Sequence, residues 1–197
     1  MQVDPTIFRA YDIRGLYPSQ LNEGAMEKIA KGIFTFFVSK LQLSRPPKIV
    51  FSYDGRVSTP ALSSKARKAL ADSGAEIIDI GLSSTPTFYF AVFNYGYDAG
   101  IQISASHNPK EWNGVKMVLN TPQGLQKIGR DTGMRDIADI VRSERFLSLG
   151  TPGKVKLKEG ILEEEVQSAF EFLGNPSIGR YKVVADPANA MGAVYLD

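Results

Sequence analysis

A short loop between two apolar runs carries the residues of this sequence that are best suited to chemistry. Residues 103–118 read ISASHNPKEWNGVKMV, and they include His107, the only histidine among the 197 residues. A hydroxyl, an imidazole and an amide follow one another at Ser106, His107 and Asn108, and a lysine follows at Lys116. A loop of this kind can expose a hydroxyl nucleophile and also direct backbone N–H groups at an anion.

Three interpretations of this loop follow from the residues. In the first, the histidine is an ordinary hydrogen-bonding residue and Asn-Pro is a turn. In the second, Ser106 is the nucleophile of a serine hydrolase. Against it, an extended segment would direct the adjacent side chains of Ser106 and His107 apart, and no G-x-S-x-G sequence surrounds the serine. In the third, Ser106 carries a phosphoryl group, whose charge of about −1.5 to −2 needs cations and amide donors nearby.

Lys116 and His107 are suited to the third interpretation. Lys116 lies in the next predicted strand, and a hairpin return would bring its ammonium back to the loop. His107 titrates near neutral pH and can donate a proton to a sugar oxygen. In-line phosphoryl transfer depends on positioning and charge stabilisation more than on a strong base.

The loop resembles the active-site loop of the α-D-phosphohexomutases, the phosphomannomutase/phosphoglucomutase family. That family has Thr/Ser-x-Ser-His-Asn-Pro followed by Asn-Gly-x-Lys, and SASHNPKEWNGVKM is similar throughout. FRAYDIRG at 8–15 resembles the family's N-terminal signature. SYDGRVSTP at 52–60 resembles its Asp-x-Arg-x-Ser segment. VVADPANAMG at 183–192 resembles the opening of its second domain, although Ala188-Asn189-Ala190 replaces the usual Gly-Asn-Gly.

The resemblance implies a role for each candidate residue. Ser106 would be the phosphorylated serine and would also bind Mg²⁺ through its phosphate. His107 and Lys116 would be the acid–base and charge-stabilising groups, and Arg14 would contact the phosphate. The implied catalytic set is therefore Ser106, His107, Lys116 and Arg14. The implied substrate-binding set is Tyr11, Arg14, Asn108 and Lys116.

The implied reaction interconverts hexose 6-phosphate and hexose 1-phosphate, of mannose or glucose. The phosphoserine would give its phosphoryl group to the sugar. The bisphosphorylated sugar would then return its other phosphoryl group to the serine. One alternative is a non-catalytic module that binds sugar phosphates. A second is a phosphoglucosamine mutase, but that branch tends to have a Thr-Asp-Gly version of the YDIRG motif.

Other polar residues near these motifs have structural interpretations. Asp12 is expected to be an ion-pair partner of Arg9 or Arg14. Asp54 and Arg56 are expected to pair and to shape their own loop. The Asp-Gly-Asp-x-Asp-Arg metal loop of the family is not found, since GRDTGMRD at 129–136 has a different order. The remaining Mg²⁺ ligands are therefore expected outside this chain.

Alternating helical and strand-like segments predict an α/β fold. It would be a three-layer α/β/α sandwich with a mixed, mostly parallel sheet, and the turn signal Asn113-Gly114 makes the last strand antiparallel. Helices are expected over 22–41, 58–74, 83–96, 134–144 and 161–174, and strands over 48–54, 75–81, 98–104 and 113–119.

The chain is expected to divide into two parts. Residues 1–152 would be the domain with the serine loop, and residues 153–197 would be a linker helix and the first strand of an incomplete second domain, at 180–189. Alone, the chain is expected to have little or no mutase activity. The remaining domains would have been cut away or would come from a second chain.

Composition excludes several classes of function. The net charge is +2 and there is no cysteine, so we expect neither nucleic-acid binding nor a thiolate metal site. The apolar run IFTFFVSKL at 33–41 is shorter than the about 20 residues that a membrane helix needs. The N-terminus lacks the pattern of a secretory signal. We therefore expect a soluble cytoplasmic protein whose partners are a hexose phosphate and the remaining domains.

Overall fold

The structure is a computed structural model that describes residues 2–188 and 190–196. It is built on one mixed sheet, which in this described part has seven strands in the order β1-β5-β4-β2-β3-β7, with β6 paired to β5. The strands are β1 (Ile13–Leu16), β2 (Lys48–Tyr53), β3 (Glu76–Leu82), β4 (Ala99–Ile103), β5 (Trp112–Thr121), β6 (Gly124–Lys127) and β7 (Val155–Leu157).

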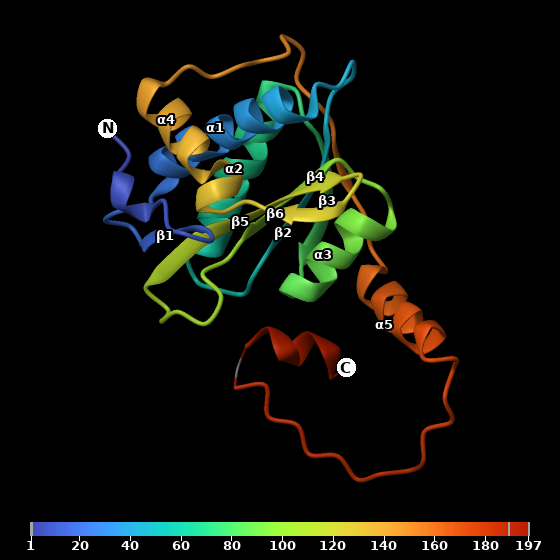
Figure 1. The fold of residues 1–197 in the computed structure, drawn as a ribbon. Helices are drawn as coiled ribbons and strands as arrows, with labels where there is room; N and C mark the ends of the chain where they lie inside the picture. The colour runs from blue at the N-terminus through green and yellow to red at the C-terminus, as the bar shows by residue number, and fades with distance from the viewer. Residues whose placement is uncertain (1, 189, 197) are drawn as a thin grey trace.

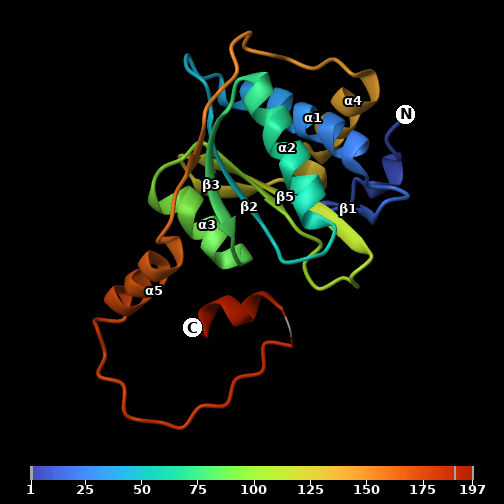
Figure 2. The same cartoon turned by 180° about the vertical axis from the view of Figure 1, so that it is seen from behind.

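Helices cover both faces of the sheet, as Figures 1 and 2 show. They are α1 (Glu23–Leu41), α2 (Thr59–Ser73), α3 (Thr85–Asn94), α4 (Arg135–Ser143) and α5 (Ile161–Phe172), with short helical turns η1 (Pro5–Ile7), η2 (Arg130–Met134) and η3 (Met191–Tyr195). Helices α1, α2 and α4 share the larger apolar core with one face, and α3 and the start of α5 share the smaller core with the other. The predicted three-layer α/β/α sandwich is confirmed.

The helix boundaries follow from local capping. The side chain of Asn22 accepts a hydrogen bond from the backbone of Ala25 at the start of α1, and Ser84 accepts one from Thr87 at the start of α3. Gly74 ends α2 with a φ of 111°, which a residue with a Cβ rarely adopts. Ser58 precedes α2 and would be a common capping residue, but its side chain makes no cap, and its hydroxyl accepts from Asn113 Nδ2 at 2.9 Å.

The strand pairing confirms a mixed sheet but not a mostly parallel one. Strand β2 pairs in parallel with β3 and β4, and β3 with β7, whereas β5 runs antiparallel to β1, β4 and β6. Parallel and antiparallel pairings are therefore equal in number over the described residues. The reason is the length of β5, whose ten residues pair with β1 and β6 along the side that faces away from β4.

The sequence predicts a new strand and its following loop within 180–189, and the strand is wrong for the part that is described. Residues 180–188 form no strand, and Val183 and Val184 are almost fully exposed. A strand needs a neighbour that pairs with its N–H and C=O groups, and this segment has no such neighbour in the described part of the chain. Asn189 lies outside the described residues. The chain continues into η3, where the Tyr195 hydroxyl contacts Ser84 and Thr87 on α3.

Nothing in the described part of the chain could cross a membrane as a helix, since no helix there is both long and apolar enough.

Candidate active site around the Ser106 loop

The loop that joins β4 to β5 turns its serine out to solvent. Ser106 has a left-handed φ of 57°, and its backbone N–H donates to the hydroxyl of Ser104 at 2.9 Å. The N–H of Asn108 then closes the turn on the carbonyl of Ala105 at 3.2 Å. Ser104 is buried and Ser106 is exposed, so the turn presents one hydroxyl and hides the other.

The left-handed turn also overturns one argument made from the sequence. The segment is not extended at Ser106, and its Oγ lies 3.4 Å from His107 Nδ1. The two side chains therefore point toward each other. A serine hydrolase also needs a carboxylate that orients the imidazole. None contacts His107 among the residues that the structure describes, so the hydrolase interpretation lacks its third member.

Arg14 ties the N-terminal loop to the serine loop. It lies on β1 opposite Gly114 of β5, and its Nη1 donates to Asn108 Oδ1 at 3.1 Å. Its other terminal nitrogen forms an ion pair with Asp12, which confirms the expected pairing of that carboxylate. Lys116 Nζ lies 3.8 Å from the same carboxylate. Two cations and one anion thus meet beside the loop.

Lys116 is more enclosed than a lysine on a solvent face. Burial lowers the pKa of its ammonium, the carboxylate of Asp12 opposes this, and the charges of Arg14 and Lys127 lower the pKa further. Around Lys116, three cations (Lys116, Arg14 and Lys127) therefore act with one carboxylate, that of Asp12. An added anion would relieve this imbalance.

A cleft of about 520 Å³ lies beside these residues. Its lining is Arg9, Ala10, Tyr11, Asp12, Arg14, His107, Asn108 and Trp112. Tyr11 is 88% exposed, so its ring is open to solvent and does not pack in the core. Arg9 lies over the Trp112 ring at 5.9 Å, at the rim. Four predicted site residues thus meet at the cleft, whereas Ser106 and Lys116 lie outside its lining.

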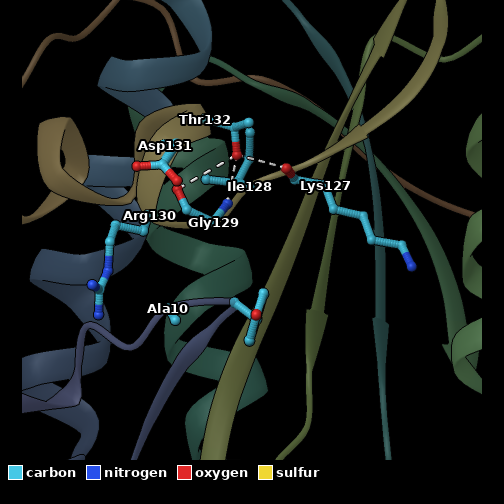
Figure 3. A pocket seen from close by; sticks show the side chains of 8 residues that line it. Ala10, Lys127, Ile128, Gly129, Arg130, Asp131 and Thr132 are labelled. Carbon is cyan, nitrogen blue, oxygen red and sulfur yellow. Dashed lines mark hydrogen bonds between the residues drawn. The ribbon is translucent and has the colours of Figure 1, made fainter.

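A second hollow of about 490 Å³ adjoins Ala10 and Tyr11 on the other side (Figure 3). Its wall is a turn in which the Thr132 hydroxyl accepts from Gly129 N and donates to the Lys127 carbonyl, both at 2.7 Å. The N–H of Arg130 donates to the Ala10 carbonyl at 2.8 Å. This turn therefore holds the N-terminal loop in place.

The described residues do not form a metal site by themselves. No group of three or more histidine, cysteine, aspartate or glutamate residues among them could hold an ion. A divalent ion at Ser106 would need carboxylates from outside the described residues.

The contacts of Arg56 with the serine loop were not predicted from the sequence. Arg56 pairs with Asp54 at 3.0 Å, as expected, but it also donates to backbone carbonyls of the serine loop. Sequence offers no signal for such contacts, because every residue has a carbonyl and only the fold places it.

The fold and this site together define an α/β/α domain that presents an exposed serine on a loop bound by the guanidinium of Arg14. The chain belongs to the phosphoglucomutase/phosphomannomutase family: the family profile described as "Phosphoglucomutase/phosphomannomutase, alpha/beta/alpha domain I" matches residues 5–147. This confirms the family resemblance drawn from the motifs.

Relatives and solved structures agree with this assignment. The chain is 37% identical over 193 residues to a phosphomannomutase of Salmonella typhimurium and 32% identical over 192 residues to one of Vibrio cholerae. In both cases 98% of this chain is covered, but only 40% of the relative. A phosphomannomutase of Klebsiella pneumoniae is 36% identical over 162 residues, which is 97% of its length.

A phosphoglucomutase/phosphomannomutase family protein of Burkholderia thailandensis has a similar structure. The TM-score is 0.73 at 26% identity, over 91% of this chain and 38% of that one. The chain thus spans about 40% of the length of the first relatives and structures that it matches.

Proposed function

We propose that this chain is the phosphoserine-bearing part of a phosphohexomutase. Ser106 would carry the phosphoryl group, and a hexose 6-phosphate and its 1-phosphate isomer would be interconverted through a bisphosphorylated sugar. The observation that carries the proposal is the exposed, left-handed Ser106 on a loop that Arg14 contacts through Asn108, with Lys116 close to the same Asp12 that pairs with Arg14. Relatives named phosphomannomutase and phosphoglucomutase support mannose or glucose as the sugar.

The chain's own residues would act by positioning and charge. Ser106 Oγ would bond to phosphorus as the P–O bond of the donor sugar breaks, and His107, 3.4 Å away, would hold or return the hydroxyl proton. Arg14 and Lys116 would compensate the charge of the phosphoryl group. Tyr11 and Asn108 would contact the substrate from the cleft.

Mg²⁺ remains a proposal for the complete enzyme. The phosphate of Ser106 would supply one ligand, and the carboxylates would come from the remaining domains or a second chain. The division of the chain into 1–152 and 153–197 also stays a prediction. Beyond residue 152, β7 pairs with β3 and Ile161 packs in the smaller core, so both belong to the same sheet and core as the first part. The cytoplasmic location expected from the sequence stays a prediction too.

Intact-mass spectrometry tests the proposal directly. The chain is incubated with a hexose bisphosphate and Mg²⁺, then denatured and weighed. We expect the mass of one added phosphoryl group. It should be lost in Ser106→Ala and kept in the control Ser19→Ala, which changes an exposed serine distant from Ser106 in sequence. A sugar-phosphate-binding module would bind the bisphosphate and gain no covalent mass, and that outcome would overturn the proposal.

A further inference from the structure

The guanidinium of Arg56 lies at the centre of the serine loop. Arg56 belongs to the segment between β2 and α2, and its Nη2 donates to the carbonyls of Ser106 and Asn108, both at 2.7 Å. Its Nη1 donates to the carbonyls of Pro109 at 2.7 Å and Trp112 at 3.1 Å. One side chain thus binds four carbonyls across the whole loop.

These bonds use every donor that the side chain has. A guanidinium has five N–H groups, and the fifth, on Nε, donates to Asp54 Oδ2 at 3.0 Å. Arg56 therefore has no N–H left for a phosphate or a sugar. This separates it from Arg14 and Lys116, which face the cleft or lie beside it.

Arg56 is itself held in place from behind. Asp54 is buried, and its Oδ1 accepts from the backbone N–H of Arg56 at 3.2 Å and from the Thr59 hydroxyl at 2.9 Å. The same Thr59 oxygen accepts from Asn113 Nδ2 at 3.0 Å, where β5 begins. The charge of Arg56 is therefore compensated, and its position is tied to both β2 and β5.

We propose that Arg56 is the positioning residue of the phosphoserine loop, an inference that rests on the proposed function. By binding the carbonyls on both sides of His107, it holds the left-handed turn that directs Ser106 Oγ outward. Three backbone N–H groups, of Ser106, Asn108 and Trp112, make the other backbone hydrogen bonds inside the loop. The Ser106 and His107 side chains also contact each other, and from outside the loop Arg14 binds the Asn108 side chain and the Tyr17 N–H binds the Glu111 carbonyl. In the part of the chain that the structure describes, Arg56 alone binds carbonyls along the whole loop. Without Arg56 the loop would sample other conformations, and a misplacement of about 1 Å can slow a reaction about 10²-fold.

Hydrogen exchange tests this claim without any catalysis. In Arg56→Ala we expect the N–H groups of Asn108 and Trp112 to exchange about tenfold faster or more, while those of α1 keep their protection. Arg45→Ala is the matched control, because Arg45 also pairs with an aspartate, Asp98, but far from the loop. Unchanged exchange in the loop of Arg56→Ala would overturn the proposal.

A second variant covers the case in which Arg56→Ala does not fold. Arg56→Lys keeps the charge but has three donors for the four carbonyls and Asp54. The N–H groups of Asn108 and Trp112 should exchange faster in this variant than in the wild-type chain, but more slowly than in a loop that has lost all the bonds of Arg56. A rate equal to wild type would count against the inference.

Phosphorylation by a hexose bisphosphate separates positioning from binding. We expect Arg56→Ala to be phosphorylated about 10²-fold more slowly at saturation, with an unchanged half-saturating concentration, because Arg56 has no donor for the ligand. Free guanidinium ions should restore part of the rate. If the variant keeps the wild-type rate, the inference fails. If the wild-type chain gains no phosphate, the proposed function fails, and hydrogen exchange still decides the role of Arg56.

Discussion

At the scale of single residues, the site is assembled from three separate stretches of the chain. The N-terminal loop supplies Tyr11 and Arg14, the β4–β5 loop supplies Ser106 to Asn108, and β5 supplies Lys116. Arg14 joins two of these stretches through its bond to Asn108. The charges near the loop are then balanced only in part by Asp12, which is the condition that an anion-binding site requires.

Lys116 should make stability depend on pH. Its pKa is lowered in the folded chain, mainly by burial, from the ordinary value of 10.5 that it regains on unfolding. Between these two values the unfolded state binds more protons, so the free energy of unfolding should rise with pH. In Lys116→Met this rise should disappear, and the variant should be more stable than wild type at any pH where Lys116 is charged in both the folded and the unfolded chain.

Urea unfolding from about pH 7 to about pH 10 measures this difference. The exposed Lys110→Met is the control, and its pH profile should follow that of the wild-type chain. A rise of equal size in Lys116→Met would show that another group causes it.

Residue types were predicted better than residue contacts. The resemblance selected the residues that now lie around one loop, and the ion pairs Asp12–Arg14 and Asp54–Arg56 were expected. The side chains of Ser106 and His107 were predicted to point apart, and this was wrong. The sequence contains no signal for the left-handed φ of Ser106 that brings them together. The reach of Arg56 to the loop depends on backbone carbonyls, which carry no residue signal.

At the scale of elements, strong periodicity predicted well, whereas the turn expected at Asn113-Gly114 was wrong, because both residues lie inside β5 and pair with β1. Four strands and five helices form close to where the alternation of apolar residues placed them. The short strands β1 and β6 were missed, because four residues are too few to show a period and β5 supplies their pairing. Segment 180–188 failed for the opposite reason, since its pattern suits a strand but the described chain offers no partner.

The antiparallel pairing of β1 with β5 should depend on a glycine. A Cβ added at Gly114 would lie 2.2 Å from the carbonyl oxygen of Ile13, a backbone atom that cannot turn away. Gly114→Ala should therefore destabilise the chain by about 1–3 kcal/mol or more and displace the strand that carries Arg14.

Thermal and urea unfolding measure this effect. Gly24→Ala is the matched control, because a Cβ there meets nothing closer than 3.4 Å and alanine favours the helix α1 by up to about 1 kcal/mol. A Gly114→Ala variant as stable as wild type would contradict the packing described for β1.

At the scale of the whole molecule, the chain spans about 40% of its first relatives. Within the described residues it offers a serine and cations, but no group of acids that could hold a metal. We therefore expect the chain alone to interconvert mannose or glucose phosphates far more slowly than the about 1–10³ s⁻¹ typical of enzymes. A coupled assay of sugar 6-phosphate formation measures this, and a normal rate would refute the need for further domains.

The most direct test of the central claim is to locate the phosphate. After incubation with a hexose bisphosphate, tandem mass spectrometry of the digested chain distinguishes Ser106 from its neighbour Ser104, which is buried. The account predicts phosphate on Ser106 and none on Ser104. Phosphate on another residue, or on none, would contradict it.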